Sequence, residues 1–307
     1  MSVRSYVLRV LVGLCVLVLL VPTLFTLAIP YIHTAGASRA EAALSLPGDD
    51  ILTKPQLSWI HAISIDAPPE QVWPWIAQMG DRRGGFYSFT FIENRVGSIT
   101  GAENYQVVYR NAERIMPEWQ NPQPGDPLIE GALKVSAVEP GRWLLADSVD
   151  PAALGWTWLW KLVPLDDGER TRLIVRMRIQ TPAQISNPLM SVAFDAGGFV
   201  MEQRMLHGIK LRAEGGAEPA WAEGVEIGLW LAALICGLIA AGLFVALQDW
   251  LRPLAVALAA LLVLFVLTFV QPALWVRLLC DLALVAGLGW AAVLPIATQR
   301  RPVLVGR

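Results

Sequence analysis

The loop predicted between Gln78 and Ser88, QMGDRRGGFYS, brings two arginines, two glycines and two aromatic residues together. Arginine binds an anionic head group through paired hydrogen bonds, and glycine lets a ligand approach the backbone closely. Arg82 and Arg83 are therefore candidates for holding such a head group, with Tyr87 forming part of an apolar wall at the entry. The alternative interpretation is a glycine turn that ends the preceding helix, with its arginines solvated or paired to nearby carboxylates.

Glu93 and Asn94 are polar residues in a short segment that is otherwise aromatic and apolar, FTFIEN. If both side chains point into a cavity, they form a polar pair there, and burial would raise the pKa of the glutamate. The alternative is a surface glutamate that forms a salt bridge with a nearby arginine. The sequence leaves both interpretations open.

The three histidines are scattered, and none has the HxH or HxxxH spacing of a metal site. We therefore expect no metal ion, and we also expect no cofactor. His207 shares the last predicted helix with Glu202, but residues five apart on a helix do not face one another well. A solvated or structural role is the simpler interpretation for His207, which remains a candidate ligand contact. His61 falls on one face of a predicted strand together with Trp59.

Trp156, Trp158 and Trp160 alternate along a predicted strand and therefore share one of its faces. Three indoles on one face favour core packing, because each buries a large apolar area. The alternatives are an aromatic ligand site or a surface that rests on the membrane. Met201 and Met205, one turn apart on the last predicted helix, are further candidate ligand contacts.

The apolar residues, 55% of the chain, are concentrated in long uncharged runs. About 20 consecutive apolar residues are enough to cross a bilayer. Runs within 1–30, 227–247, 254–270 and 274–297 therefore predict about four transmembrane helices. A cleaved signal peptide is the alternative for the first, but its apolar run exceeds the usual core of about 7–15 residues. Arg277 and Asp281 interrupt the fourth run at a spacing that allows local pairing near the interface.

Basic residues near the ends of the spans predict the orientation, because they remain on the cytoplasmic side. Arg4 and Arg9 precede the first span, Arg252 lies between the second and third, and a basic tail over 299–307 follows the last. With four spans, all of these fall on one side. The N- and C-termini are therefore expected to be cytoplasmic, and the segment between the first two spans is expected to face outward.

That segment, residues 31–224, contains 17 basic and 23 acidic residues. The acidic balance argues against nucleic acid as a partner, which would require a basic surface. All three cysteines lie in the predicted spans, which excludes a disulfide or a cysteine-ligated zinc ion from this segment. Its length suits one domain with its own core.

The periodicity of this segment predicts an α+β domain. We expect a strand over 57–68, short helices over 67–80 and 87–97, four antiparallel strands within 132–181, and a long helix over 187–214. The last strand alternates apolar residues with arginines, so one face of the sheet should be buried and the other wet. A helix laid across a curved sheet leaves an apolar pocket unless large side chains fill it.

Four stretches together resemble the SRPBCC superfamily, the START-like, helix-grip proteins that include polyketide cyclase/dehydrase and lipid-transport relatives. They are ISIDAPPEQVWPWIAQMG, RRGGFYSFTFIEN, RIMPEWQNPQPGD and FVMEQRMLHGIKLRAE. The resemblance covers about residues 57–214 and is closest to bacterial members that join one such domain to membrane spans. It implies a curved antiparallel sheet around a long C-terminal helix, and a cavity for a hydrophobic ligand. It implies no particular activity.

The chain then divides into a transmembrane signal anchor (1–30), a tether (31–55), the SRPBCC/START-like domain (56–215), three transmembrane helices (225–298) and a basic cytoplasmic tail (299–307). We expect a multi-pass protein of the bacterial inner membrane whose extracytoplasmic domain binds a lipid or other hydrophobic small molecule. One alternative is a cyclase, dehydratase or hydrolase-like enzyme that uses Glu93, His207 or Tyr87 for proton transfer. The other is a structural or sensor component of an envelope complex. Protein partners are not predicted.

Overall fold

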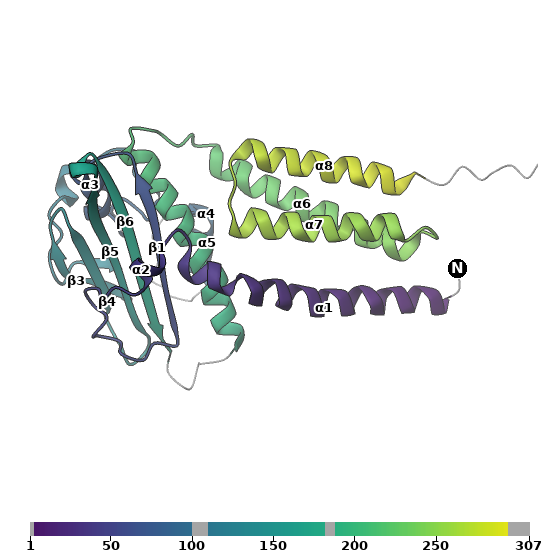
Figure 1. The fold of residues 1–307 in the computed structure, drawn as a ribbon, viewed down its shortest axis with the longest axis horizontal. Coiled ribbons are helices and arrows are strands. Elements are labelled where there is room, and N and C mark those ends of the chain that lie inside the picture. Colours follow the sequence, from purple (N-terminus) through teal and green to yellow (C-terminus); the bar gives the residue numbers. More distant parts are fainter. Residues whose placement is uncertain (1–2, 100–109, 182–187, 294–307) are drawn as a thin grey trace, which may run out of the picture. The chain divides into compact units, whose positions relative to one another are not determined.

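The computed structural model describes residues 3–99, 110–181 and 188–293, and the chain forms two compact units. Residues 24–222 make up an α+β domain (Figure 1). Residues 1–23 and 223–307 make up the second unit, whose described part consists of apolar helices.

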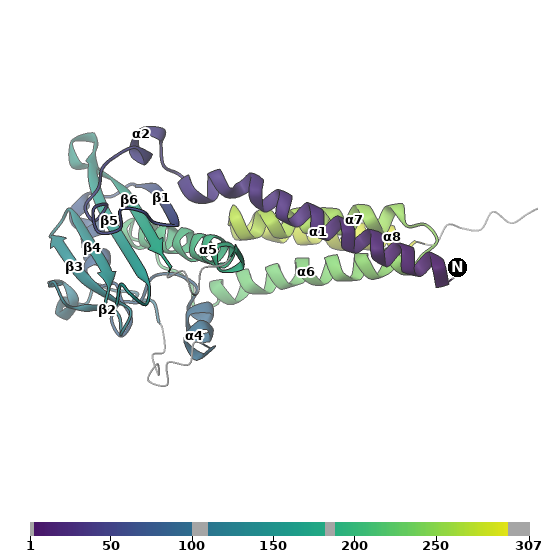
Figure 2. The same cartoon turned by 90° about the horizontal axis from the view of Figure 1, so that it is seen from below.

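A single antiparallel sheet of six strands forms the centre of the α+β domain, in the order β1-β6-β5-β4-β3-β2 (Figure 2). The strands are β1 (Leu57–Ile65), β2 (Pro127–Ile129), β3 (Leu133–Glu139), β4 (Trp143–Ser148), β5 (Gly155–Leu165) and β6 (Arg170–Gln180). Five of them confirm the predicted strands, whereas β2 is too short to show alternation. The first strand pairs with the last along its whole length, from Leu57↔Ile179 to Ile65↔Thr171.

The helices of the domain connect the strands or lie against the sheet. They are α2 (Arg39–Ala42), α3 (Pro69–Ala77), α4 (Thr90–Ile99) and α5 (Pro188–Ala213), with 3-10 turns at Pro117–Trp119 and Asp166–Gly168. Proline opens α3, as predicted, because its fixed φ suits the first helical position. The helix ends at Ala77, three residues before the predicted stop at Gly80.

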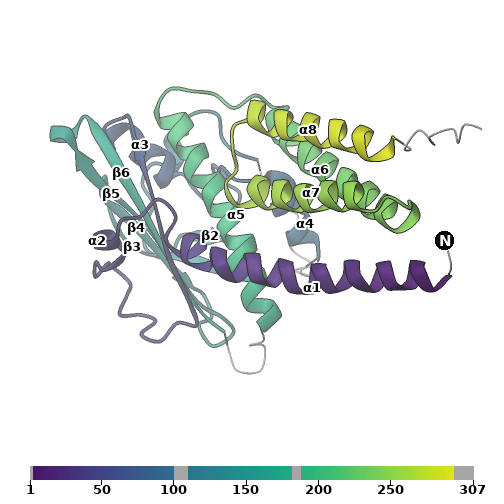
Figure 3. The same cartoon turned by 45° about the vertical axis from the view of Figure 1, so that its right-hand side comes forward.

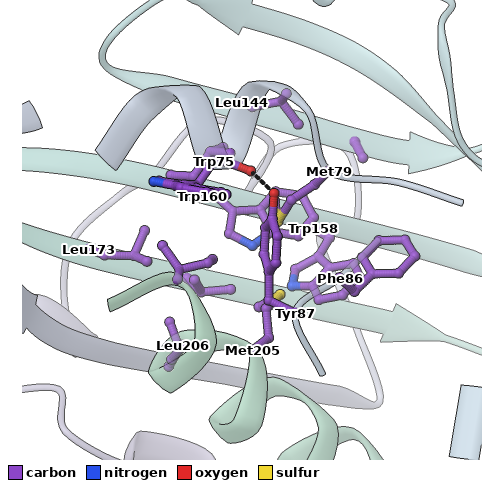
Figure 4. Close-up of a cluster of buried hydrophobic side chains, with 14 of the residues drawn as sticks. Trp75, Met79, Phe86, Tyr87, Leu144, Trp158, Trp160, Leu173, Met205 and Leu206 are labelled. Atoms are coloured by element: carbon purple, nitrogen blue, oxygen red, sulfur yellow. Dashed lines mark hydrogen bonds between the residues drawn. The ribbon is translucent and has the colours of Figure 1, made fainter. Parts of the chain in front are cut away.

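The main core lies between α3 and α5 and one face of the sheet, here called the inner face. Trp160 and Tyr87 are fully buried there, and Trp158 and Met205 lie beside them (Figure 4). The tryptophans of β5 therefore belong to the core, which confirms the packing interpretation. Large side chains fill this part of the space between sheet and helix.

The opposite, outer face of the sheet is covered by residues 35–52, which we call the strap. α2 of the strap and α5 lie on opposite faces of the sheet (Figure 3). Leu46 of the strap packs against Ile60 and Leu145. The arginines of β6 bind its carboxylates: Arg172 to Glu41 at 2.7 Å, Arg176 to Asp49 at 2.7 Å and Arg178 to Asp49 at 3.4 Å.

The expectation of a wet outer face is therefore wrong for β1 and β6. Alternation along β6 showed that its arginines face away from the core, but not that acidic residues of the strap reach them. The strap also lies within the range 31–55 that was expected to be a simple tether.

The Glu41–Arg172 pair predicts a pH dependence of stability. The hydrogen bond from Arg172 is the main cause that lowers the pKa of Glu41 from 4.5 to about 2. Because the folded-state pKa is the lower one, this stabilisation is present above about pH 4.5 and is lost as the pH falls towards about 2. We expect Glu41→Gln to lose about 1–2 kcal/mol of unfolding free energy at pH 7 and roughly a quarter of that at pH 2.5.

Denaturant unfolding of the full chain in detergent, repeated across this pH range, would measure the effect. The control is Glu139→Gln, whose carboxylate forms an exposed pair with Arg142. A loss for Glu41→Gln that did not change with pH would contradict the prediction.

Four helices are long and apolar enough to cross a membrane, and they support a membrane protein. They are α1 (Val3–Thr34), α6 (Ala222–Ala246), α7 (Leu251–Phe269) and α8 (Leu274–Ala292). Helices α6, α7 and α8 lie side by side (Figures 1 and 2). Helix α1 continues to Thr34, past residue 30 where the anchor was expected to end. The predicted basic tail, 299–307, lies outside the described residues.

Arg9 places the start of α1 and the end of α6 at the same end of this unit. Its guanidinium donates to the carbonyl oxygens of Phe244 at 3.2 Å and Gln248 at 3.3 Å, and also to that of Leu247. The last carbonyls of a helix have no partner within it, and a cation is favourable there. Arg9 therefore satisfies the C-terminal end of α6.

Candidate functional site

A buried histidine–glutamate pair joins β1 to α5 on the inner face of the sheet. His61 Nδ1 lies 2.6 Å from Glu202 Oε1, and the two side chains are 0% and 1% exposed. Glu202 lies on the face of α5 that also carries Phe199, Leu206 and Ile209, all of them buried. A charged residue thus occupies a core position of an otherwise apolar helix face.

The hydrogen bonds around this pair involve both ring nitrogens of His61 and both carboxyl oxygens of Glu202. His61 Nε2 lies 2.6 Å from the carbonyl oxygen of Ile32, which can only accept, so Nε2 carries a hydrogen. Glu202 Oε2 accepts the indole N–H of Trp158 at 3.0 Å and that of Trp59 at 3.4 Å. The two are therefore a buried histidine–glutamate pair in which every ring nitrogen and carboxyl oxygen has a partner.

His61 also holds the last turn of α1 against the domain. Ile32 belongs to that turn, and its neighbours make further contacts with α5. His33 Nε2 lies 2.8 Å from Asp195 Oδ1, and the ring of Tyr31 lies 5.5 Å from that of Phe199. Two histidine–carboxylate pairs thus tie the end of α1 to β1 and α5.

The pair is poorly placed to act as an acid–base catalyst in this arrangement. The ring nitrogen of His61 that does not face Glu202 is Nε2, and it already forms a hydrogen bond with the carbonyl oxygen of Ile32. A catalytic histidine must reach the proton that it transfers, either directly or through one water. Proton transfer to a ligand would require the last turn of α1 to move away from His61.

A row of tryptophans on β5 lies beside the pair. The rings of Trp156 and Trp158 are 5.8 Å apart and those of Trp158 and Trp160 are 4.4 Å apart, and Phe86 stacks on Trp158 at 5.9 Å. Trp158 donates to Glu202, but the buried Nε1 atoms of Trp156 and Trp160 have no acceptor among the described residues. A buried donor without an acceptor costs about 1–3 kcal/mol. The inner face therefore contains two unsatisfied N–H groups.

The loop from Gly80 to Gly85 is a tight turn. Gly80 and Gly85 exchange backbone hydrogen bonds, and both have positive φ, which glycine adopts without strain. Arg83 pairs with Asp126 at 2.9 Å and lies over the ring of Trp119. This geometry agrees with the interpretation as a turn. Arg82 is exposed, and a role for either arginine in binding a head group stays a prediction.

The structure places the other predicted site residues in different surroundings. Tyr87 and Met205 are buried in the main core. The hydroxyl of Tyr87 donates to the carbonyl of Trp75 at 3.0 Å, and burial raises its pKa (Figure 4). Met201 is half-buried, and its carbonyl accepts the Ser88 hydroxyl at 2.7 Å.

The remaining candidates lie on α4 and α5. His207 is exposed, and its Nδ1 contacts the carbonyl of Gln203 at 2.8 Å on its own helix, so it does not approach Glu202. Glu93 and Asn94 are half-buried in α4. Ligand contacts by these three residues stay predictions.

Sequence reasoning missed the contact between His61 and Glu202, which are 141 residues apart. A signal was nevertheless present. His61 stands on the apolar strand face with Trp59, and Glu202 stands on the apolar helix face with Phe199 and Ile209. Two groups that can carry opposite charges, each on a face that must be buried, have a reason to be each other's partner.

Comparisons with known proteins add little to this geometry. No family model and no curated protein sequence matches the chain. Among solved structures, MLL2253 from Mesorhizobium loti is 16% identical, covering 52% of this chain and 98% of its own, with a TM-score of 0.30. CalU16 from Micromonospora echinospora is 18% identical, covering 53% and 77%, with a TM-score of 0.27.

DynU16, a protein of the dynemicin biosynthetic locus, is 18% identical and covers 50% of this chain and 47% of its own, with a TM-score of 0.27. At TM-scores this low, the similarities carry no argument about function. Membership of the SRPBCC superfamily therefore stays a prediction.

Proposed function

We propose that residues 24–222 form a START-like, helix-grip module that binds a lipid or other hydrophobic small molecule between the inner face of the sheet and α5. The observation that carries this proposal is the pair of buried indole N–H groups, of Trp156 and Trp160, without acceptors among the described residues. They lie in an aromatic layer that would supply apolar contact area to a ligand; because large side chains fill the space around Trp160, the ligand would displace part of that packing. A ligand oxygen that accepts from them removes the cost of leaving them unsatisfied.

The apolar helices keep this module at the membrane, where hydrophobic molecules are concentrated. The distribution of basic residues supports an inner-membrane protein with cytoplasmic termini and an extracytoplasmic domain. The contact of Arg9 with the end of α6 agrees with this arrangement, because it requires the start of the first span and the end of the second to lie on one side.

An acid–base enzyme is the second candidate, and the buried His61–Glu202 pair favours it. We rank it second because the Ile32 carbonyl occupies the ring nitrogen that would have to meet a substrate.

Native mass spectrometry of the full chain, purified in detergent from a membrane-containing host, tests the proposal. We expect a co-purifying mass of lipid size, or uptake of one compound from a panel of lipids and apolar small molecules. The double variant Trp156→Phe/Trp160→Phe should retain the aromatic surface but bind about ten-fold more weakly, because two hydrogen bonds of about 0.5–1.5 kcal/mol each are lost.

Trp143→Phe is the matched control, since its indole N–H already donates to Glu139 at 2.7 Å. Its affinity should equal that of the unmodified chain. A chain that emerges empty and takes up nothing from the panel would contradict the proposal.

A further inference from the structure

An acidic side chain lies among the apolar helices of the second unit without a hydrogen-bond partner among the described residues. Asp281 of α8 is 6% exposed, and neither carboxyl oxygen has a hydrogen-bond partner among the described residues. It lies seven residues from the start of α8, which corresponds to about 10 Å along the helix axis. The carboxyl group is therefore inside the predicted span rather than at its end.

The local pair expected between Arg277 and Asp281 does not form. Arg277 Nε donates instead to the carbonyl oxygen of Pro272 at 2.8 Å, and no ion pair joins it to Asp281 in the part of the chain that the structure describes. That expectation was wrong because a spacing of four residues permits contact but does not require it. An arginine near the start of a helix can also reach the preceding backbone.

Among the described residues, the side chains around Asp281 donate no hydrogen bond to it, although the Cys236 thiol of α6 is near enough to interact with it electrostatically. Leu284, about one turn further along α8, packs against Cys236 of α6 and Leu267 of α7, so this side of α8 meets both helices. Trp230 packs against the same cluster, but its indole N–H already donates to the hydroxyl of Thr268 at 2.9 Å. That hydroxyl in turn donates to the carbonyl of Leu264 at 2.7 Å.

A bare carboxylate is strongly unfavourable in such a place, so the group requires a cation. A metal ion would need several oxygen ligands, and no group of three metal-ligating side chains exists among the described residues. A proton needs only the carboxyl oxygen itself. We propose that Asp281 is an intramembrane proton-binding site, whose carboxyl group takes up and releases one proton within the α6–α8 unit.

This site is independent of the ligand site in the α+β domain. It also carries a stability cost, because the carboxyl group forms no hydrogen bond to the described residues of the neighbouring helices. An apolar side chain of similar size would pack better in the same position. A structural carboxylate would show the opposite behaviour, since its removal would leave a partner unsatisfied.

Labelling with dicyclohexylcarbodiimide tests the proposal on the full chain in lipid nanodiscs. This reagent adds to protonated carboxyl groups in apolar surroundings. The acid proton moves to one carbodiimide nitrogen, the carboxyl oxygen bonds to the central carbon, and transfer of the acyl group to nitrogen leaves a stable N-acylurea.

We expect one adduct per chain, mapped to Asp281 by peptide mass spectrometry, and faster labelling at lower pH. Asp281→Asn should abolish it. The control Asp249→Asn changes a carboxylate between α6 and α7 that is 39% exposed and pairs with Arg252, and it should leave labelling unchanged. Absence of an adduct at Asp281, or equal labelling of Asp281→Asn, would overturn the proposal.

Thermal unfolding of Asp281→Leu provides a second readout. We expect an unchanged or higher Tm, because the leucine replaces an unpaired polar group. A Tm lowered by several degrees in both Asp281→Leu and Asp281→Asn would show that the carboxylate has a structural partner, and would also overturn the proposal.

Discussion

His61→Leu is expected to lower the unfolding free energy of the α+β domain by about 3–5 kcal/mol. The substitution leaves the Glu202 carboxyl group buried without its histidine partner, and it leaves the carbonyl of Ile32 without a donor. Denaturant unfolding of the full chain in detergent, followed by tryptophan fluorescence, would measure the loss. His207→Leu is the matched control, because that histidine is exposed and contacts only its own helix; we expect a change within about 0.5 kcal/mol.

The double variant His61→Leu/Glu202→Leu removes both partners, so it separates the penalty of leaving one buried polar group unpaired from the net contribution of the pair to stability. Replacing both members of a buried ion pair with apolar residues is often close to neutral. We therefore expect the double variant to be more stable than His61→Leu alone, although the indoles of Trp59 and Trp158 then lose their acceptor. Equal losses for His61→Leu and His207→Leu would show that the buried pair does not stabilise the domain.

Gly208→Ala is expected to destabilise the domain by about 1–3 kcal/mol. At a helix position with free space around the glycine, the same substitution would stabilise the helix. A Cβ atom at Gly208 would lie 2.4 Å from the carbonyl oxygen of Tyr87 and 2.8 Å from its Cβ, so α5 would have to move off the loop that carries Tyr87. Gly197→Ala, on the same helix, meets nothing within 4 Å and should stabilise by about 0.5–1 kcal/mol.

Thermal unfolding distinguishes the two variants by the sign of the shift. A change of 1 kcal/mol moves the Tm of a domain of this size by about 2–4 °C. A Tm for Gly208→Ala at or above that of the unmodified chain would mean that α5 and the Tyr87 loop are not in close contact.

Both predictions concern the position of α5. Glu202 and Gly208 both lie on this helix. Glu202 is hydrogen-bonded to His61 of β1 and to Trp158 of β5, and Gly208 lies against the backbone of Tyr87. In the proposed binding module, this helix is one wall of the ligand site. His61 binds both Glu202 of α5 and the carbonyl of Ile32 at the end of α1. A displacement of α5 would therefore also disturb the contact between His61 and the end of α1.

Single elements could be predicted from the sequence because their signals are local. The alternation of Leu173 and Val175 with arginines predicted β6 and the side of it that is buried, since successive side chains of a strand point to opposite faces. The length of the apolar runs predicted four helices able to span a membrane. Tryptophans at every second position predicted the packed face of β5.

The candidate site could be predicted only in part, for a related reason. The sequence predicted Tyr87 at the entry of a cavity and Met205 as a ligand contact, whereas both are buried in the main core. It also indicated that His207 and Glu202, five residues apart, are poorly spaced to pair on one helix. It could not show that His61 is the partner of Glu202.

What only the tertiary structure decided is which elements meet. The pairing of the first strand with the last aligns Leu57 with Ile179, and the strap brings Asp49 to Arg176, 127 residues away. Tertiary packing also places His61 beside Glu202 and directs Arg277 to the carbonyl of Pro272 instead of to Asp281. The physical reason is that a spacing along one element determines which side chains share a face, whereas a contact between elements depends on the register and the packing of the whole chain.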